Sequence, residues 1–175
     1  MSRLKRALFA TVALLVCLTV YTHAQTIQEL EKRNGFKDIK LGMRIDSLKG
    51  NKYKKDVKVN EEFEARLYTV ENPAYSRIGE VAIDKIEVVT YKDLIFEITV
   101  VTDKDSRLMK ALESIYGLAD YDMKRETYFW KGADITLKFR SHSKNKLELV
   151  YTSYRILSMM KEDKVKKVQD IADDF

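Results

Sequence analysis

Apolar residues at every second position through the middle of the chain place the strongest constraint on its fold. Phe63, Ala65 and Leu67 alternate with charged residues, so an extended chain would place the two kinds of side chain on opposite sides. Residues 86–90 and 94–102 show the same period and are rich in β-branched residues, which favour strands. We therefore predict antiparallel strands joined by short turns.

The register of the hairpin formed by the last two segments depends on the length of its turn. A two-residue turn would set Glu87 beside Ile98 on the buried face. A three-residue turn would instead pair Ile86 with Ile98 and so continue the apolar face. We expect the three-residue turn for this reason.

A further hairpin is predicted from residues 127–130 and 133–139, with a two-residue Lys-Gly turn between them. This turn places Tyr128 and Trp130 on the same face as the apolar residues of the second segment. We therefore expect the only tryptophan of the chain to lie in the core.

Across the loop that follows, a register that pairs Phe139 with Leu147 sets Lys138 opposite Glu148, and apolar packing then agrees with charge. The outward face of these strands is mixed polar with one aromatic residue. Such a face is usually the solvated side of an antiparallel sheet, and the alternative is a surface that binds a protein or a glycan. Its residues are Thr136, Lys138, Arg140, Glu148, Thr152 and Tyr154.

Two segments have the spacing and end signals of helices. Residues 26–34 end at a glycine. In residues 103–116, Asp103 or Asp105 can cap the start of a helix, and Gly117 ends it.

Residues 155–175 are predicted to form an amphipathic helix, because apolar residues recur at three- and four-residue spacing among charged ones. We expect this stripe to cover the protein's own core, as most such stripes do. The alternative is a helix that binds a partner or forms a dimer. The stripe consists of Val165, Val168, Ala172 and Phe175.

Residues 1–24 have the pattern of a secretory signal, in which a basic segment precedes an apolar run at residues 7–20 and a small-x-small cleavage site. That run is shorter than the about 20 residues that a membrane-spanning helix needs. Lipidation at Cys17 would require a small residue before the cysteine, and Val16 is not one. We therefore expect a protein without a lipid anchor that is periplasmic or secreted.

Cleavage after Ala24 would leave residues 25–175 without cysteine and with His142 as the only histidine. Thiol nucleophiles, disulfides and multi-histidine metal sites are then excluded. The same cleavage lowers the net charge from +5 to +2, which offers no electrostatic case for binding nucleic acid. The remaining length suits a single compact domain over residues 25–175.

Few of the remaining residues suggest catalysis or metal binding. Asp120, Asp122 and Glu126 include the donor atoms of a calcium site or of a carboxylate-dependent hydrolase. The EF-hand spacing and its glycine are missing, so we expect an ordinary acidic turn. His142 lies in a polar segment between strands, where we expect a solvated loop residue. We therefore expect no catalytic residue, no metal and no cofactor.

The order of the predicted elements is helix, three or four strands, helix, three strands and helix. We predict an α+β protein in which helices pack on one face of an antiparallel sheet. The order also suggests two tandem helix-plus-meander units, followed by the C-terminal helix.

Residues 36–43 are predicted to be extended and to lead through Gly42 into a helical turn at residues 44–48. The sequence Lys-Leu-Gly-Met-Arg-Ile-Asp-Ser-Leu at residues 40–48 resembles the opening of small bacterial envelope proteins with the β-lactamase-inhibitor-protein-like fold. It is also similar to that of the related outer-membrane assembly lipoproteins. The predicted hairpin that contains Phe-Trp-Lys-Gly at residues 129–132 looks like the strand-turn-strand hairpins of these proteins. The resemblance implies that the chain has this fold. It also implies that the chain binds other proteins through the sheet face that helices leave uncovered.

Together these features indicate an exported, non-enzymatic protein that binds a partner or belongs to the envelope and acts through its polar sheet face. The expected partner is another envelope protein or a cell-wall glycan, and the sequence leaves the oligomeric state open. The alternatives are a periplasmic hydrolase that uses carboxylates and a purely structural envelope component. No transmembrane segment is expected in residues 25–175.

Overall fold

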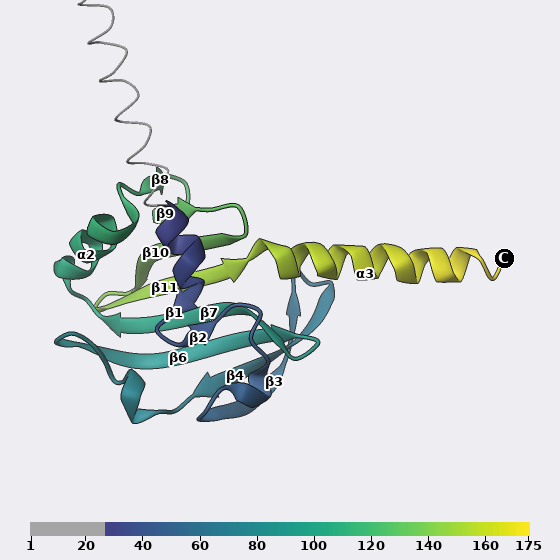
Figure 1. Ribbon diagram of the computed structural model, residues 1–175, viewed down its shortest axis with the longest axis horizontal. Helices are drawn as coiled ribbons and strands as arrows, with labels where there is room; N and C mark the ends of the chain where they lie inside the picture. The colour runs from purple at the N-terminus through teal and green to yellow at the C-terminus, as the bar shows by residue number, and fades with distance from the viewer. Residues whose placement is uncertain (1–26) are drawn as a thin grey trace, which may run out of the picture.

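The computed structural model describes residues 27–175 of the chain (Figure 1). The predicted export signal at residues 1–24, with Cys17, lies outside the described residues, so export and the absence of a lipid remain predictions. The helical elements are residues 27–33, η1 (Ile45–Ser47), η2 (Pro73–Tyr75), α2 (Ser106–Tyr116) and α3 (Tyr154–Ala172).

One sheet of nine antiparallel strands forms the centre of the molecule, in the order β3-β4-β6-β7-β11-β10-β9-β8, with β5 paired to β6. The chain forms two successive meanders, each preceded by a helix, and they meet where β7 pairs with β11. This architecture confirms the predicted α+β class. The strands are β1 (Gly35–Phe36), β2 (Ile39–Lys40), β3 (Asn51–Val59), β4 (Phe63–Val70), β5 (Arg77–Ile78), β6 (Val81–Tyr91), β7 (Leu94–Asp103), β8 (Asp120–Asp122), β9 (Thr127–Lys131), β10 (Ile135–Ser143) and β11 (Lys146–Ser153).

The turns before the main sheet follow the predicted glycines, although the predicted extended piece is divided into the short β1–β2 hairpin. Gly35 has φ 139°, and a Cβ at this position would lie 2.3 Å from the carbonyl oxygen of Ile39, so only glycine fits. Gly42, with φ 83°, then leads the chain into η1.

The first face of the sheet carries the larger core. Helical residues 27–33 and α2 lie over it (Figure 1), and Leu30, Leu108 and Leu112 are buried there. Trp130 is 3% exposed on this face, which confirms the prediction that it lies in the core.

The second face carries a smaller core, formed where α3 begins. Ile156 and Met160 from α3 are buried with Ala65 of β4 and Phe96 of β7. The predicted one-sided arrangement therefore describes α2 and the N-terminal helical residues, whereas α3 packs its first turns on the opposite face.

The predicted three-residue turn between β6 and β7 is wrong. Lys92 and Asp93 form a two-residue turn, and both have positive φ, as a tight hairpin turn requires. A bulge at Phe96 then shifts the register by one residue, so that Val88 lies opposite Ile98. The apolar face is continuous, as expected, but the bulge rather than the turn produces it.

The predicted register of β10 and β11 is also wrong, by two residues. The strands continue farther than expected into the 144–145 turn, so Phe139 pairs with Leu149 and Arg140 with Glu148. Lys138 lies opposite Val150 instead of Glu148. A shift by an even number of residues leaves every side chain on its predicted face.

The turn between β9 and β10 is longer than predicted, since Lys131 pairs with Thr136 and the Gly132 amide donates to the Ile135 carbonyl. Trp130 lies opposite Leu137 and Tyr128 lies opposite Phe139. These pairs keep both aromatic residues on the predicted face.

The outer half of α3 extends away from the sheet (Figure 1) and has an exposed apolar stripe. The exposed fractions are 68% for Val165, 58% for Val168, 61% for Ile171 and 105% for Phe175. The expectation that this stripe covers the protein's own core is therefore wrong, because Ile156 and Met160 perform that role one to three turns earlier.

Candidate functional site

The residues predicted as a polar face come together on one side of the sheet, which we call the outer sheet face. Thr136, Lys138 and Arg140 alternate along β10, opposite Thr152, Val150 and Glu148 of β11. Tyr154 follows at the start of α3, and its ring lies 5.8 Å from the Lys131 ammonium. Five of the six predicted residues lie on this face, Tyr154 belongs to α3 instead of the sheet, and the role of the face in binding remains a prediction.

The members differ in exposure. Lys138 and Arg140 are exposed, Thr152 and Tyr154 are half-buried, and Thr136 is 3% exposed. The Thr136 hydroxyl has no hydrogen-bond partner among residues 27–175. Buried polar atoms without partners are rare in folded proteins, and this one lies beneath the surface of the face.

Glu148 is the centre of a charged cluster at one end of this face. Its carboxylate is buried and accepts a hydrogen bond from Arg140 Nε, and His142 Nδ1 lies 2.7 Å from its other oxygen. His142 belongs to strand β10, so the expectation of a loop position is wrong, although the side chain is exposed as expected. The strand extends farther than its polar composition suggested, and this brings His142 to Glu148.

Sequence reasoning missed Glu97, which joins the outer sheet face from β7. Glu97 pairs with Thr152 across the β7–β11 ladder and with Val89 of β6. Burial raises the pKa of the Glu97 carboxyl, and the charge of Glu148 adds to the effect, while Lys138 opposes it. The alternation of side chains could have identified Glu97, because it directly precedes Ile98. Ile98 faces inward, so Glu97 faces outward.

We expect the Glu97→Gln variant to be more stable than the wild type at neutral pH. The folded-state pKa of Glu97 lies above the unfolded value, so the folded state retains this proton to higher pH. The group's contribution to stability is complete below the unfolded pKa of about 4.3 and is lost as the pH rises through the folded pKa.

Urea unfolding between pH 4 and pH 8 measures this difference, with the exposed Glu64→Gln as the control. The gain from Glu97→Gln should grow with pH, while Glu64→Gln should show no such trend. A pH-independent gain would contradict the electrostatic cause.

The acidic residues considered for calcium or hydrolysis do not form a site. Asp122 Oδ1 accepts hydrogen bonds from the backbone amides of Lys124 and Arg125. Asp122 is therefore part of the turn between β8 and β9. Asp120 and Glu126 are exposed beside this turn. Within residues 27–175, no group of three histidine or acidic side chains is placed to hold a metal ion. These findings agree with the predicted acidic turn.

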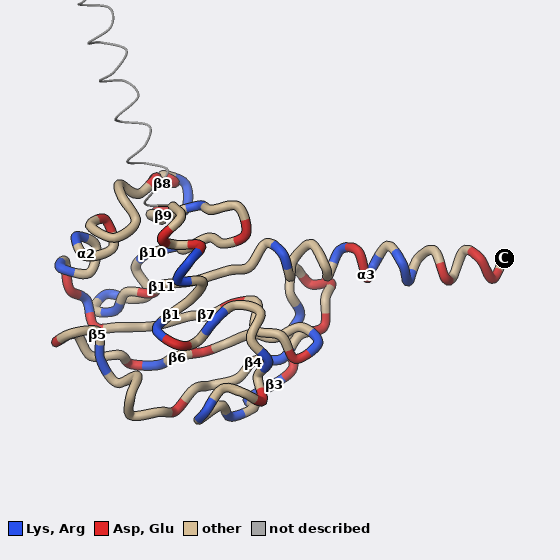
Figure 2. The backbone as a smooth tube through the Cα atoms, viewed as in Figure 1, with Lys and Arg blue, Asp and Glu red and all other residues tan. Residues whose placement is uncertain are grey.

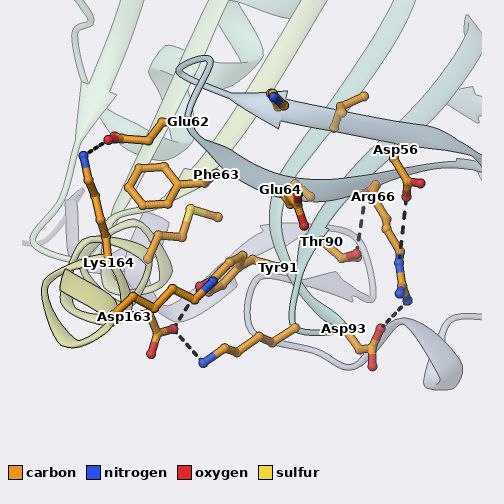
Figure 3. A pocket seen from close by; sticks show the side chains of 16 residues that line it. Asp56, Glu62, Phe63, Glu64, Arg66, Thr90, Tyr91, Asp93, Asp163 and Lys164 are labelled. Carbon is orange, nitrogen blue, oxygen red and sulfur yellow. Dashed lines mark hydrogen bonds and ion pairs between the residues drawn. The ribbon is translucent and has the colours of Figure 1, made fainter. Parts of the chain in front are cut away.

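A groove of about 910 Å³ lies elsewhere, between α3, the β3–β4 hairpin and the β6–β7 turn (Figure 3). We call it the α3 groove. Phe63, Ala65 and Met160 supply apolar surface, and charged side chains surround them. It contains none of the residues of the outer sheet face.

The charged side chains of the α3 groove are largely paired with one another (Figure 3). Asp163 lies 2.7 Å from the Lys92 ammonium and accepts a hydrogen bond of 3.0 Å from the Tyr91 hydroxyl. The hydrogen bond from Lys92 lowers the pKa of Asp163. Lys164 pairs with Glu62 of the hairpin. These contacts hold α3 against the sheet. We therefore assign the charged side chains of the groove a structural role.

Comparisons of this chain with family models, with curated proteins and with solved structures found no match. What the fold and the site define is therefore an α+β protein with a curved nine-stranded antiparallel sheet and a polar outer face. Among the helices in residues 27–175, none has the length and apolar character needed to cross a membrane.

Proposed function

We propose that the chain is an exported, non-enzymatic binding protein that holds another envelope protein on its outer sheet face. The observation that carries the proposal is the mixed polar surface of the predicted face, which offers exposed Lys138 beside half-buried Glu97 and Thr152. A partner's backbone or side-chain groups would form hydrogen bonds with these accessible groups.

The chemistry of this face suits a broad protein surface better than a small molecule. Small ligands favour concave, mostly apolar pockets, and the described groove lies beside α3 instead. Exposed Lys138 offers positive charge and half-buried Glu97 offers a carboxyl group, while Arg140 is held in place by buried Glu148. Mixed charges of this kind give an interface its orientation and specificity.

The carboxylates of this face favour binding over hydrolysis. Glu97 lies opposite Thr152, and Glu148 lies opposite Val101, so the two acids are four residues apart along each strand. That offset corresponds to about 13 Å of extended chain. General acid and base groups of a hydrolase must both reach one reacting bond, and this spacing supports the non-enzymatic proposal.

Photo-crosslinking in the organism that encodes the chain tests the proposal. A photoreactive amino acid replaces Lys138 on the outer sheet face or, as the matched control, exposed Lys110 on α2. We expect a discrete adduct with an envelope protein from position 138 only. The same adducts from both positions, or none from position 138, would contradict a binding role for this face.

The crosslinked adduct also separates the possible partners. An adduct that proteases reduce to the size of this chain indicates a protein, whereas one that only cell-wall hydrolases reduce indicates a glycan. The second result would contradict the proposed protein partner.

A further inference from the structure

The outer α3 stripe is an organised apolar surface that the fold leaves open. We define it as Val165, Val168, Ile171, Ala172 and Phe175, all of which are exposed. Val165, Val168 and Ala172 follow the three- and four-residue spacing of a helix-pairing seam, and Phe175 follows in the turn after the helix end. Isolated exposed apolar residues need no explanation, but a continuous stripe on a projecting helix indicates a contact surface.

The inner half of α3 holds the stripe away from the body of the protein. Met160 is fully buried, and Asp163 is fixed by Lys92 and Tyr91. These contacts set the direction of the helix at its base. The stripe begins immediately after them, continues along the projecting part of α3 to Ala172 and ends in the turn that follows (Figure 1).

Charge along the projecting part is strongly asymmetric (Figure 2). Residues 165–167 contain two lysines and no acidic residue, whereas residues 168–175 contain three aspartates and no basic residue. Two such helices side by side in the same direction would place like charges together. In the opposite direction, the basic part of each helix lies beside the acidic part of the other.

We infer that the outer α3 stripe pairs with the same stripe of a second copy, with the two helices antiparallel. Val165 of each copy then lies near Phe175 of the other, and Val168 lies near Ala172. Lys166 and Lys167 lie beside Asp173 and Asp174 of the other copy. Because α3 projects, the two bodies remain at opposite ends of the helix pair (Figure 1).

The charge of the segment also argues against an anionic membrane as the occupant. Residues 161–175 carry four basic and five acidic residues. Membrane-surface helices carry an excess of Lys and Arg on their polar face, which this segment lacks. The helical part of the stripe, from Val165 to Ala172, spans only about 12 Å, so the dimer should be concentration-dependent.

Sedimentation equilibrium of the purified exported protein from about 10 μM to about 1 mM tests the pairing. The wild type should change from monomer to dimer across this range. Val168→Asp places a charge in the seam and should raise the dissociation constant by about tenfold or more. Because Val168 is exposed in the monomer, circular dichroism should show an unchanged fold.

Charge exchange tests the antiparallel direction. Lys166→Asp with Lys167→Asp, and Asp173→Lys with Asp174→Lys, should each abolish the dimer through like-charge contacts. An equimolar mixture of the two variants should form a dimer as strong as the wild type. Lys49→Asp with Lys144→Asp makes the same charge change on exposed residues of the body and should leave the dimer intact.

Two outcomes would overturn the inference. A wild type that stays monomeric to about 1 mM excludes self-pairing, and the stripe then serves a different partner. A mixture that dimerises far more strongly than the wild type indicates parallel helices, in which the natural charges repel. This measurement uses purified protein alone, so its failure is independent of the partner expected on the outer sheet face.

Discussion

Replacing Trp130 with alanine is expected to lower the free energy of unfolding by about 3–5 kcal/mol. The side chain is 3% exposed, and its ring meets the Tyr116 ring edge-on at 6.1 Å between centroids. Its Nε1 donates a hydrogen bond of 2.8 Å to the Gly117 carbonyl, at the end of α2. The substitution therefore leaves a cavity in the core and an unpaired carbonyl where α2 meets the sheet.

Urea unfolding followed by far-ultraviolet circular dichroism measures this loss, because the variant lacks the tryptophan fluorescence. Trp130→Phe is the control that retains an aromatic ring but removes the donor, and it should cost about 1–2 kcal/mol. Equal losses for both substitutions would show that the hydrogen bond to Gly117, and not the packing, dominates.

Replacing Met160 with alanine should cost about 2–5 kcal/mol, whereas Val168→Ala should stay within about 0.5 kcal/mol of the wild type. Both residues lie on α3. Met160 is fully buried with Phe96 and Ile156, while Val168 is 58% exposed beyond the last contact with the body. The same kind of truncation therefore removes packing in one half of the helix and almost none in the other.

Both variants should be compared at low micromolar concentration, where self-association does not add to stability. Val165→Ala is a second exposed substitution that should behave like Val168→Ala. A loss at Val168 as large as that at Met160 would mean that the outer half of α3 packs against the body, contrary to the structure.

The faces of the strands could be predicted from the sequence, but their registers could not. Alternation alone placed Trp130, Leu137 and Phe139 on one side and Lys138 on the other, as the structure shows. The exact partners depend on turns and bulges, whose energies are small compared with burial. The bulge at Phe96 leaves no periodic signal, because it occurs within a continuous apolar run.

The candidate site shows the same division. The members of the outer sheet face followed from alternation along two neighbouring strands. Glu97 belongs to the other meander and reaches this face only because β7 pairs with β11, a contact between residues about 50 positions apart. His142 was misplaced because polar composition suggested a loop where β10 continues.

The sequence by itself determined which residues alternate, where helices end and which side chains face outward, because these depend on local chain geometry. Only the tertiary structure decided what covers each apolar surface. The apolar spacing of α3 continues past Met160 into the outer α3 stripe, yet its first turns are buried and its last turns are exposed. Periodicity records that a face is apolar, and the length of the neighbouring sheet decides how much of that face the protein itself can bury.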